Sequence, residues 1–483
     1  DEVGTRTMTT IEFSVSDEAG DADVLVSGLT ADGVAEAPEG LGDHLAARGF
    51  KADLGSTVLV PREGGGSRLL VGLGSEAVDA QGLRRAAAGA ARALSHHRSA
   101  ATTLLADAGA EDTGGAQALA EGFALGAYRY GEFKSEFEPH VLEAVTVLSG
   151  VAGVADGLAR GARVAEAVNV ARDLVNEPGG SLTPPALADR AVALGEAGGI
   201  TVDIMDKAAI ESAGFGGLLG VNRGSFHEPR FIRMTHAPDG ASGHVVLVGK
   251  GITFDAGGLS IKTADGMYGM NGDMGGGAAV IATLSAVAAL APGVKVTGLV
   301  PSTDNMLGPD ATRPGDVLTI SNGTTVEVVN TDAEGRLILA DGLAEASKEA
   351  PDAIIDLATL TGACMVALGP RIAGLMSNDD TLAAKVTAAA EGAGERVWRL
   401  PLPTDMEKAI ESPVADIKNL GNRYGGALAA GLFLQHFVAD DIPWVHLDIA
   451  GPAWLDDADG ENPKHGTGFG VRTLLELLTT WSD

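Results

Sequence analysis

Short apolar runs that favour β-strands alternate along this chain with longer segments that favour α-helices. In the amino-terminal part, we expect strands near residues 11–15, 22–26, 56–60, 68–71 and 101–105, and helices near 83–94 and 116–128. Beyond residue 180, we expect strands at 201–204, 230–235, 244–248, 295–299 and 353–358, and helices at 184–197, 207–213 and 277–289. This alternation is typical of a mostly parallel sheet covered by helices, so the sequence predicts an α/β protein.

The length of the chain indicates more than one domain. Its 483 residues exceed the ~250–300 residues at which single cores stop growing. A long helix is expected over 154–175, where apolar residues recur at helical spacing before a Pro-Gly-Gly stop. Counting from Met8, taken as the natural start, the sequence predicts a smaller amino-terminal α/β domain, a helical linker and a carboxy-terminal mixed-sheet α/β domain: 8–153, 154–180 and 181–483.

The stretch Asn330–Leu337 (NTDAEGRL) places two carboxylates and a guanidinium at alternate positions after a strand-like run. Side chains two apart in an extended segment share a face, so Asp332, Glu334 and Arg336 are expected to converge on one site. Two anions on a buried face repel each other unless a cation neutralises them, and a divalent metal ion is the candidate. The alternative is a solvated turn with an Asp/Arg pair.

A second polar cluster follows the predicted strand at 244–248. Lys250, Asp255, Lys262 and Asp273 are spread among glycines, which let a backbone turn sharply and approach an ion closely. A lysine beside carboxylates is either an ordinary ion-pair partner or, desolvated beside a metal ion, a neutral nitrogen ligand. The two clusters together supply four carboxylates, two lysines and one arginine, which strengthens the prediction of a metal site.

Both segments resemble those of the leucyl aminopeptidase (cytosol aminopeptidase) family of two-metal exopeptidases, for which NTDAEGRL is the most diagnostic string. The resemblance includes RDLVN at 172–176, LLGV at 218–221, DLATLTG at 356–362 and WVHLDIAG at 444–451. It therefore covers the chain from roughly residue 165 onwards. It implies an aminopeptidase that removes the first residue, preferably Leu- or Met-like, from peptides with a free α-amine, using a water shared by two metal ions.

The resemblance also implies roles for individual residues. One Zn²⁺ or Mn²⁺ ion, with Co²⁺ as a further candidate, would bind Lys250, Asp255, Asp273 and Glu334. A second ion would bind Asp255, Glu334 and Asp332. Lys262 would stabilise the developing oxyanion, and Arg336 would hold a bicarbonate ion that shuttles the proton. The alternative for each lysine and for Arg336 is an ion pair that only neutralises the cluster. The substrate pocket would include Met270, Thr359, Leu360, Gly362 and Ala450.

Charge and composition limit the partners of the chain. A net charge of -31 argues against nucleic acid and anionic membranes, because both are polyanions. No apolar run reaches the ~20 residues of a membrane span. A single cysteine, Cys364, excludes an intramolecular disulfide and suits a reducing cytoplasm, and we interpret Cys364 and His446 as core residues.

The family resemblance further implies a homohexamer with peptides as substrates. Two alternative functions stay open at this point. One is a dipeptidase of narrow specificity, such as for cysteinyl-glycine, on the same site. The other is a DNA-binding or scaffold role of the same fold, against which the complete set of site residues and the negative charge weigh.

Overall fold

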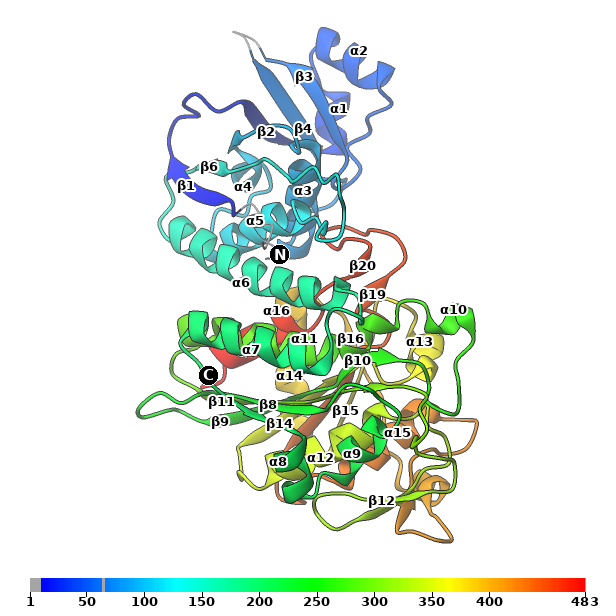
Figure 1. Ribbon diagram of the computed structural model, residues 1–483. Helices are drawn as coiled ribbons and strands as arrows, with labels where there is room; N and C mark the ends of the chain where they lie inside the picture. The colour runs from blue at the N-terminus through cyan, green and yellow to red at the C-terminus, as the bar shows by residue number, and fades with distance from the viewer. Residues whose placement is uncertain (1–9, 63–65, 483) are drawn as a thin grey trace. The chain divides into compact units, whose positions relative to one another are not determined.

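A computed structural model describes residues 10–62 and 66–482 of the chain. Its contacts divide the chain into two compact units (Figure 1). Unit 1 runs to Asn169 and includes Asp456–Lys464, and unit 2 comprises Val170–Leu455 and the chain from His465 onwards. The division falls inside helix α6 (Val154–Asn176), whereas the sequence kept 456–464 with the second domain. Met8 lies outside the described residues.

Unit 1 is built on a six-stranded sheet in the order β1-β6-β5-β2-β4-β3. The strands are β1 (Glu12–Ser16), β2 (Val24–Leu29), β3 (Thr57–Pro61), β4 (Ser67–Gly72), β5 (Ser99–Thr102) and β6 (Ala144–Leu148). All neighbours pair in parallel except β3 with β4, which confirms the predicted mostly parallel sheet. The sequence did not predict strand β6 or the short helices α1 (Ala31–Ala35), α2 (Glu39–Ala47) and α4 (Leu104–Asp107).

Two small-residue helices, α3 (Ala80–Ala93) and α5 (Thr113–Gly126), pack closely in unit 1. A Cβ atom at Gly122 would lie 2.3 Å from the carbonyl oxygen of Arg84, so only glycine permits this approach. Between the helices, Arg84 Nε lies 2.6 Å from a carboxylate oxygen of Glu121, and both side chains are buried. The two charges can be buried in the helix interface because each neutralises the other.

The segment Asp456–Lys464 belongs to unit 1 through contacts with α3, although it follows most of unit 2 in the chain. Arg85 Nη2 lies 2.9 Å from Asp459 Oδ1, and Gln81 Nε2 donates to Glu461 Oε1 at 3.0 Å. The strands β19 (Trp454–Leu455) and β20 (His465–Gly466) flank the segment and belong to unit 2. The chain therefore passes three times between the units.

Unit 2 contains a nine-stranded sheet in the order β16-β15-β18-β14-β9-β11-β8-β7, with β10 paired to β11. The strands are β7 (Thr201–Met205), β8 (Arg230–His236), β9 (His244–Gly249), β10 (Gly251–Asp255), β11 (Lys295–Asn305), β14 (Ala353–Ala358), β15 (Ala373–Ser377), β16 (Val397–Arg399) and β18 (Trp444–Asp448). The central strands β18, β14, β9 and β11 are parallel, and antiparallel pairs flank them. The predicted mixed sheet is confirmed.

Helices cover both faces of this sheet (Figure 1). On one side lie α7 (Pro184–Gly198), α11 (Gly275–Leu290), α14 (Asp380–Ala393) and α16 (Val471–Thr479), and on the other α8 (Lys207–Ala213), α9 (Gly216–Asn222), α12 (Gly335–Ser347) and α15 (Gly426–Gln435). The smaller elements are α10 (Ala264–Met267), η1 (Met270–Met274), β12 (Val317–Thr319), β13 (Thr325–Glu327), α13 (Gly362–Leu368), η2 (Thr404–Ile410) and β17 (Ile417–Lys418).

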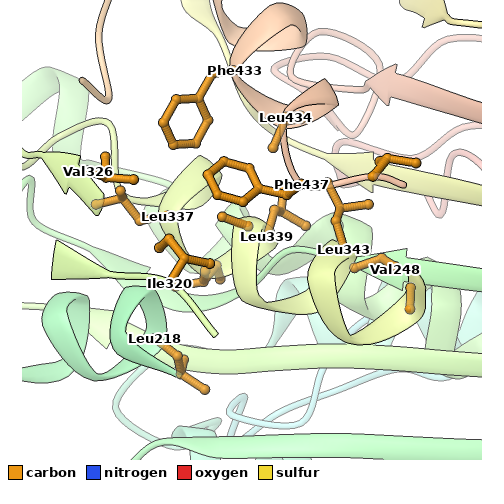
Figure 2. Close-up of a cluster of buried hydrophobic side chains, with 14 of the residues drawn as sticks. Leu218, Val248, Ile320, Val326, Leu337, Leu339, Leu343, Phe433, Leu434 and Phe437 are labelled. Atoms are coloured by element: carbon orange, nitrogen blue, oxygen red, sulfur yellow. The ribbon is translucent and has the colours of Figure 1, made fainter. Parts of the chain in front are cut away.

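Helix α12 is anchored by a buried apolar cluster that it shares with α15 and the sheet (Figure 2). Leu337 and Leu343 of α12 lie near Phe433 and Phe437, whose ring centroids are 5.1 Å apart. Each such side chain contributes about 1.5–3 kcal/mol when fully buried. The cluster therefore fixes α12, whose first turn follows directly on Glu334.

One helical stretch, Ala264–Leu290, is long and apolar enough to cross a membrane by length and composition, with a mean hydropathy of 1.5. The expectation from the sequence that no apolar run reaches the length of a membrane span missed this stretch. In the structure 78% of its most apolar window is buried, and α11 within it packs against α7, α16 and the sheet. This burial accounts for its apolar composition.

Candidate active site

The predicted site residues gather at the carboxyl ends of the central strands of unit 2, together with Asn305 and Asp448, to which no role was assigned from the sequence. Lys250 follows β9, Asp255 ends β10 and Asn305 ends β11. On the neighbouring strands, Thr359 follows β14 and Asp448 ends β18. Ligands of open α/β sheets bind at the carboxyl ends of strands, so the topology alone marks this edge as the candidate site.

The backbone of the NTDAEGRL stretch differs from its prediction. Thr331 and Asp332 form a turn, and Glu334 already has helical dihedral angles (φ -79, ψ -37) directly before α12. The expected extended segment, with three side chains on one face, is therefore wrong. The apolar run that follows buries itself as a helix, and that helix begins before Arg336. The side chains of Asp332 and Glu334 nevertheless lie in the same site, where Asp332 pairs with Lys262 and Glu334 pairs with Lys250.

Lys250 is almost fully buried and pairs with two carboxylates. Its Nζ lies 2.7 Å from Asp273 and 2.9 Å from Glu334, and it donates to the carbonyl oxygen of Thr359 at 2.9 Å. Burial by itself disfavours the ammonium, but the carboxylates outweigh it, so the pKa of Lys250 lies above its ordinary value. In this arrangement Lys250 is a charged ion-pair partner, one of the two roles that the sequence left open.

Lys262 forms the second pair of ionic contacts. Its Nζ lies 2.8 Å from Asp255 and 2.7 Å from Asp332. Burial again opposes the charge, and the neighbouring carboxylates again raise the pKa of this lysine above its ordinary value. A fixed ammonium thus lies at the more exposed end of the cluster, where its side chain retains 17% exposure.

Three buried carboxylates, those of Asp255, Asp273 and Glu334, form the centre of the site. Each offers an oxygen, and these oxygens lie within 4.8 Å of one another. Burial, together with the charge of Glu334, raises the pKa of both aspartates. Among the described residues, no hydrogen-bond donor reaches the buried Oε2 atom of Glu334. Crowded, buried carboxylates are the ligands that divalent cations take, and one oxygen of Glu334 still lacks a donor, so these residues fit a metal site.

Arg336 brings a buried guanidinium to the same region. It retains 4% exposure, and its Nε and Nη1 atoms find no hydrogen-bond acceptor among the described residues. Burial lowers the pKa of Arg336 to about 10, although Glu334 and Asp448 oppose the shift. The group still carries its charge at neutral pH and has donors to offer to an anion.

Gly335 allows α12 to begin against Lys250. A Cβ atom at this position would lie 2.5 Å from Cε and 2.7 Å from Nζ of that lysine. Contacts this short require the lysine or the helix to move. The glycine between Glu334 and Arg336 is therefore a steric requirement of the site.

The predicted pocket residues lie around this centre. The Thr359 hydroxyl donates to Asp273 Oδ1 at 2.7 Å, and Met270 begins η1, which also carries Asp273. Leu360 and Ala450 are half-buried, and Gly362 is exposed at the start of α13. The structure thus brings Thr359 into contact with the carboxylate cluster.

Sequence reasoning missed Asn305, a buried residue of the site. Its Nδ2 donates to Asp255 Oδ1 at 2.8 Å and to the carbonyl oxygen of Thr331 at 3.0 Å, so it joins the two clusters. The sequence feature that could have revealed Asn305 is the polar end of β11, an otherwise largely apolar strand, because ligands bind at this edge of the sheet. Asp448 lies within the family-like stretch WVHLDIAG, but the sequence predicted no role for it.

Two residues assigned to the core are buried there, as predicted. Cys364 is a buried free thiol, and burial raises its pKa to about 12. His446 Nδ1 lies 2.6 Å from Asp356 Oδ1, and this carboxylate raises the pKa of His446 although burial opposes it. Neither side chain belongs to the carboxylate cluster.

The fold and the site define a class: a two-unit α/β protein with a buried carboxylate–lysine centre at the strand ends of its larger sheet. Comparison with known proteins places the chain within that class. The family model of the cytosol aminopeptidase catalytic domain matches residues 169–475, and that of the N-terminal domain of the same family matches residues 28–136. The chain belongs to the cytosol aminopeptidase family, and its membership supports aminopeptidase activity.

Individual relatives agree with this assignment. A probable cytosol aminopeptidase of Rhodococcus jostii is 45% identical over 94% of each chain, and one of Cutibacterium acnes is 42% identical over 96% of this chain and 95% of the other. The bottromycin maturation enzyme BotP in complex with Mn has a TM-score of 0.88 and 42% identity, covering 96% of this chain and all of that one (100%). A mutant tomato leucine aminopeptidase has a TM-score of 0.89 and 34% identity over 98% and 97%.

Proposed function

We propose that the chain is a metal-dependent aminopeptidase that removes Leu- or Met-like first residues from peptides with a free α-amine. The observation that carries this proposal is the convergence of three buried carboxylates, whose oxygens lie within 4.8 Å of one another, in a member of the cytosol aminopeptidase family. Aminopeptidase activity follows from the family.

Two divalent cations per subunit fit the donor set. Lys250, Asp255, Asp273 and Glu334 would hold one, and Asp255, Glu334 and Asp332 the other. When bound, the pair would make water a nucleophile at neutral pH and polarise the scissile carbonyl. The Mn complex of BotP supports Mn²⁺ as one candidate, beside Zn²⁺ and Co²⁺. Cation binding would also replace part of the ammonium charge that now offsets the carboxylates.

The two other charged groups of the site, those of Lys262 and Arg336, would act on the substrate. Lys262, fixed between Asp255 and Asp332, would stabilise negative charge as it develops on the carbonyl oxygen. Arg336 cannot act as a base, because its guanidinium stays protonated at neutral pH. Its free Nε and Nη1 donors suit a small carboxylate-like anion, and we propose bicarbonate, which would carry the proton.

Specificity would come from the side chains around the cluster. Met270 and Thr359 supply a flexible thioether and a methyl group, and Gly362 and Ala450 leave room between them. Leu360 would contribute its backbone and its half-buried side chain. The same family resemblance leads us to propose a homohexamer in the cytoplasm, with peptides as the partners of each subunit.

The test is hydrolysis of a leucine anilide by protein that has been stripped with a chelator and then titrated with Mn²⁺ or Zn²⁺. We expect metal to restore activity in the wild type but not in Asp255→Ala or Glu334→Ala. Calorimetric titration of the metal should show weaker binding in both variants, because each removes a carboxylate from the buried cluster. A panel of free-amine dipeptides, including cysteinyl-glycine, then measures specificity.

Asp265→Asn is the matched control, since Asp265 is an exposed carboxylate on α10, outside the buried cluster. This variant should bind metal and hydrolyse the anilide as the wild type does. A metal-loaded wild type that is inert on the anilide and on every dipeptide would exclude the proposed peptidase activity.

A further inference from the structure

The Asp448 carboxylate lies fully buried at the end of β18 and accepts hydrogen bonds from two loops. Its Oδ1 atom accepts from the backbone N–H groups of Leu360 at 3.3 Å, Thr361 at 3.4 Å and Ala450 at 3.2 Å. Its Oδ2 atom accepts from the Thr361 hydroxyl at 2.6 Å. One side chain thus joins the loop that follows β14 to the loop that follows its own strand.

These two loops carry three of the five predicted pocket residues, Thr359, Leu360 and Ala450, and a fourth, Gly362, follows the first loop directly as the first residue of α13. The Thr361 hydroxyl also accepts from the Cys364 N–H at 3.0 Å and so caps α13, the helix that Gly362 begins. Because Asp448 holds the Thr361 hydroxyl, it orients this cap as well. Met270, the fifth pocket residue, lies on a separate element. Among the described residues, it forms no hydrogen bond with the Asp448 carboxylate.

We infer that Asp448 is a positioning residue that sets the width of the side-chain pocket by fixing the loops after β14 and β18. It acts through the backbone N–H groups of Leu360, Thr361 and Ala450. This inference rests on the proposed aminopeptidase function. A buried carboxylate with four donors is rigid, because releasing any one of them leaves a buried polar group unpaired.

The test compares Asp448→Ala with Asp448→Asn in the metal-loaded enzyme. Alanine removes every acceptor, so we expect kcat/KM for a leucine anilide to fall on the order of tenfold to a hundredfold, mainly through KM, and the leucine-to-alanine preference to shrink. Asparagine keeps an oxygen for the three N–H groups, and it should retain most of the preference. If Asp448→Ala does not fold, Thr361→Val removes the hydroxyl donor alone and should also reduce the preference.

Glu395→Ala is the matched control. Glu395 is equally a buried carboxylate, and it accepts from the N–H groups of Gly470 and Thr473 at 3.0 Å and from the Thr473 hydroxyl at 2.6 Å. It caps α16 and lies on neither pocket loop. Its loss should lower stability but leave the leucine-to-alanine preference unchanged. An unchanged preference in Asp448→Ala, or an equal change in Glu395→Ala, would overturn the inference.

Hydrogen exchange separates this failure from failure of the proposed function. In Asp448→Ala the amides of Leu360, Thr361 and Ala450 should exchange about tenfold faster or more than in the wild type, and in Glu395→Ala they should not. An inert wild type with faster exchange in Asp448→Ala would reject the peptidase and keep the positioning role. Unchanged exchange at these amides would reject the positioning role itself, whatever the activity.

Discussion

Gly335 makes the start of α12 compatible with a buried lysine. We predict that Gly335→Ala lowers leucine anilide hydrolysis by about tenfold or more, because the new methyl group would displace Lys250, and a displacement near 1 Å can cost about a hundredfold. Metal affinity, measured by calorimetric titration, should fall with activity. Gly392→Ala on α14 is the control, since its Cβ would approach nothing closer than 3.7 Å. Full activity in Gly335→Ala would show that the contact relaxes without consequence.

Asp341 gives the stability of the protein a dependence on pH. It lies fully buried on α12, and burial raises its pKa to about 7, although the N–H groups of Leu218 and Ser321 oppose the shift. Because the folded state holds this proton more tightly, the stabilisation is complete below the ordinary aspartate pKa near 4 and is lost as the pH rises through 7.

We predict that between pH 5 and pH 8 the wild type loses about 2–3 kcal/mol of unfolding free energy relative to Asp341→Asn. Urea unfolding of both proteins at several pH values measures this difference. Histidine titrations cancel in the comparison, since the two proteins share them. Parallel curves would show that Asp341 is already ionised at pH 5.

At the level of single residues, the sequence identified the charged groups of the site but not their geometry. Asp255, Asp273 and Glu334 converge as predicted, whereas the extended backbone predicted for Asp332–Arg336 is wrong. The alternation of charges at 332–336 is a local pattern. It does not reveal that the apolar residues after it pack into the core as helix α12, which begins at Gly335. Asn305 was missed because its role depends on two strand ends that meet only in the folded sheet.

At the level of elements, α16 depends on a side chain from outside the helix for its cap. Its N-cap residue is Gly470, which has no side-chain oxygen, and Glu395 accepts the N–H groups of Gly470 and Thr473 instead. We predict that Glu395→Ala lowers the free energy of unfolding by about 1–3 kcal/mol, because buried donors lose their partner. Urea unfolding measures this change. Glu391→Ala, an exposed change on α14, should stay within about 0.5 kcal/mol of the wild type.

Elements with a clear hydrophobic period and flanking breakers were predictable from the sequence, and elements without them were not. Helix α8 and strand β14 have the predicted bounds, since hydrophobic period and flanking breakers agree there. Helix α1 has only five residues and is held by the Thr30 side chain, which accepts from the Gly33 N–H. A helix this short is unstable in isolation, so no local pattern predicts it. Strands β15 and β16 likewise depend on their partners in the sheet.

At the level of the whole molecule, the discontinuity of unit 1 has a consequence for the time course of synthesis. Arg85 and its partner Asp459 are 374 residues apart in the chain. Ribosomes add roughly 5–20 residues per second, so Asp459 follows Arg85 after roughly 20–75 s. The amino-terminal unit is thus translated early but completes its contacts late, after nearly all of the catalytic domain has emerged. During that interval, the face of α3 that binds Asp456–Lys464 has no native partner, and it is then open to chaperones.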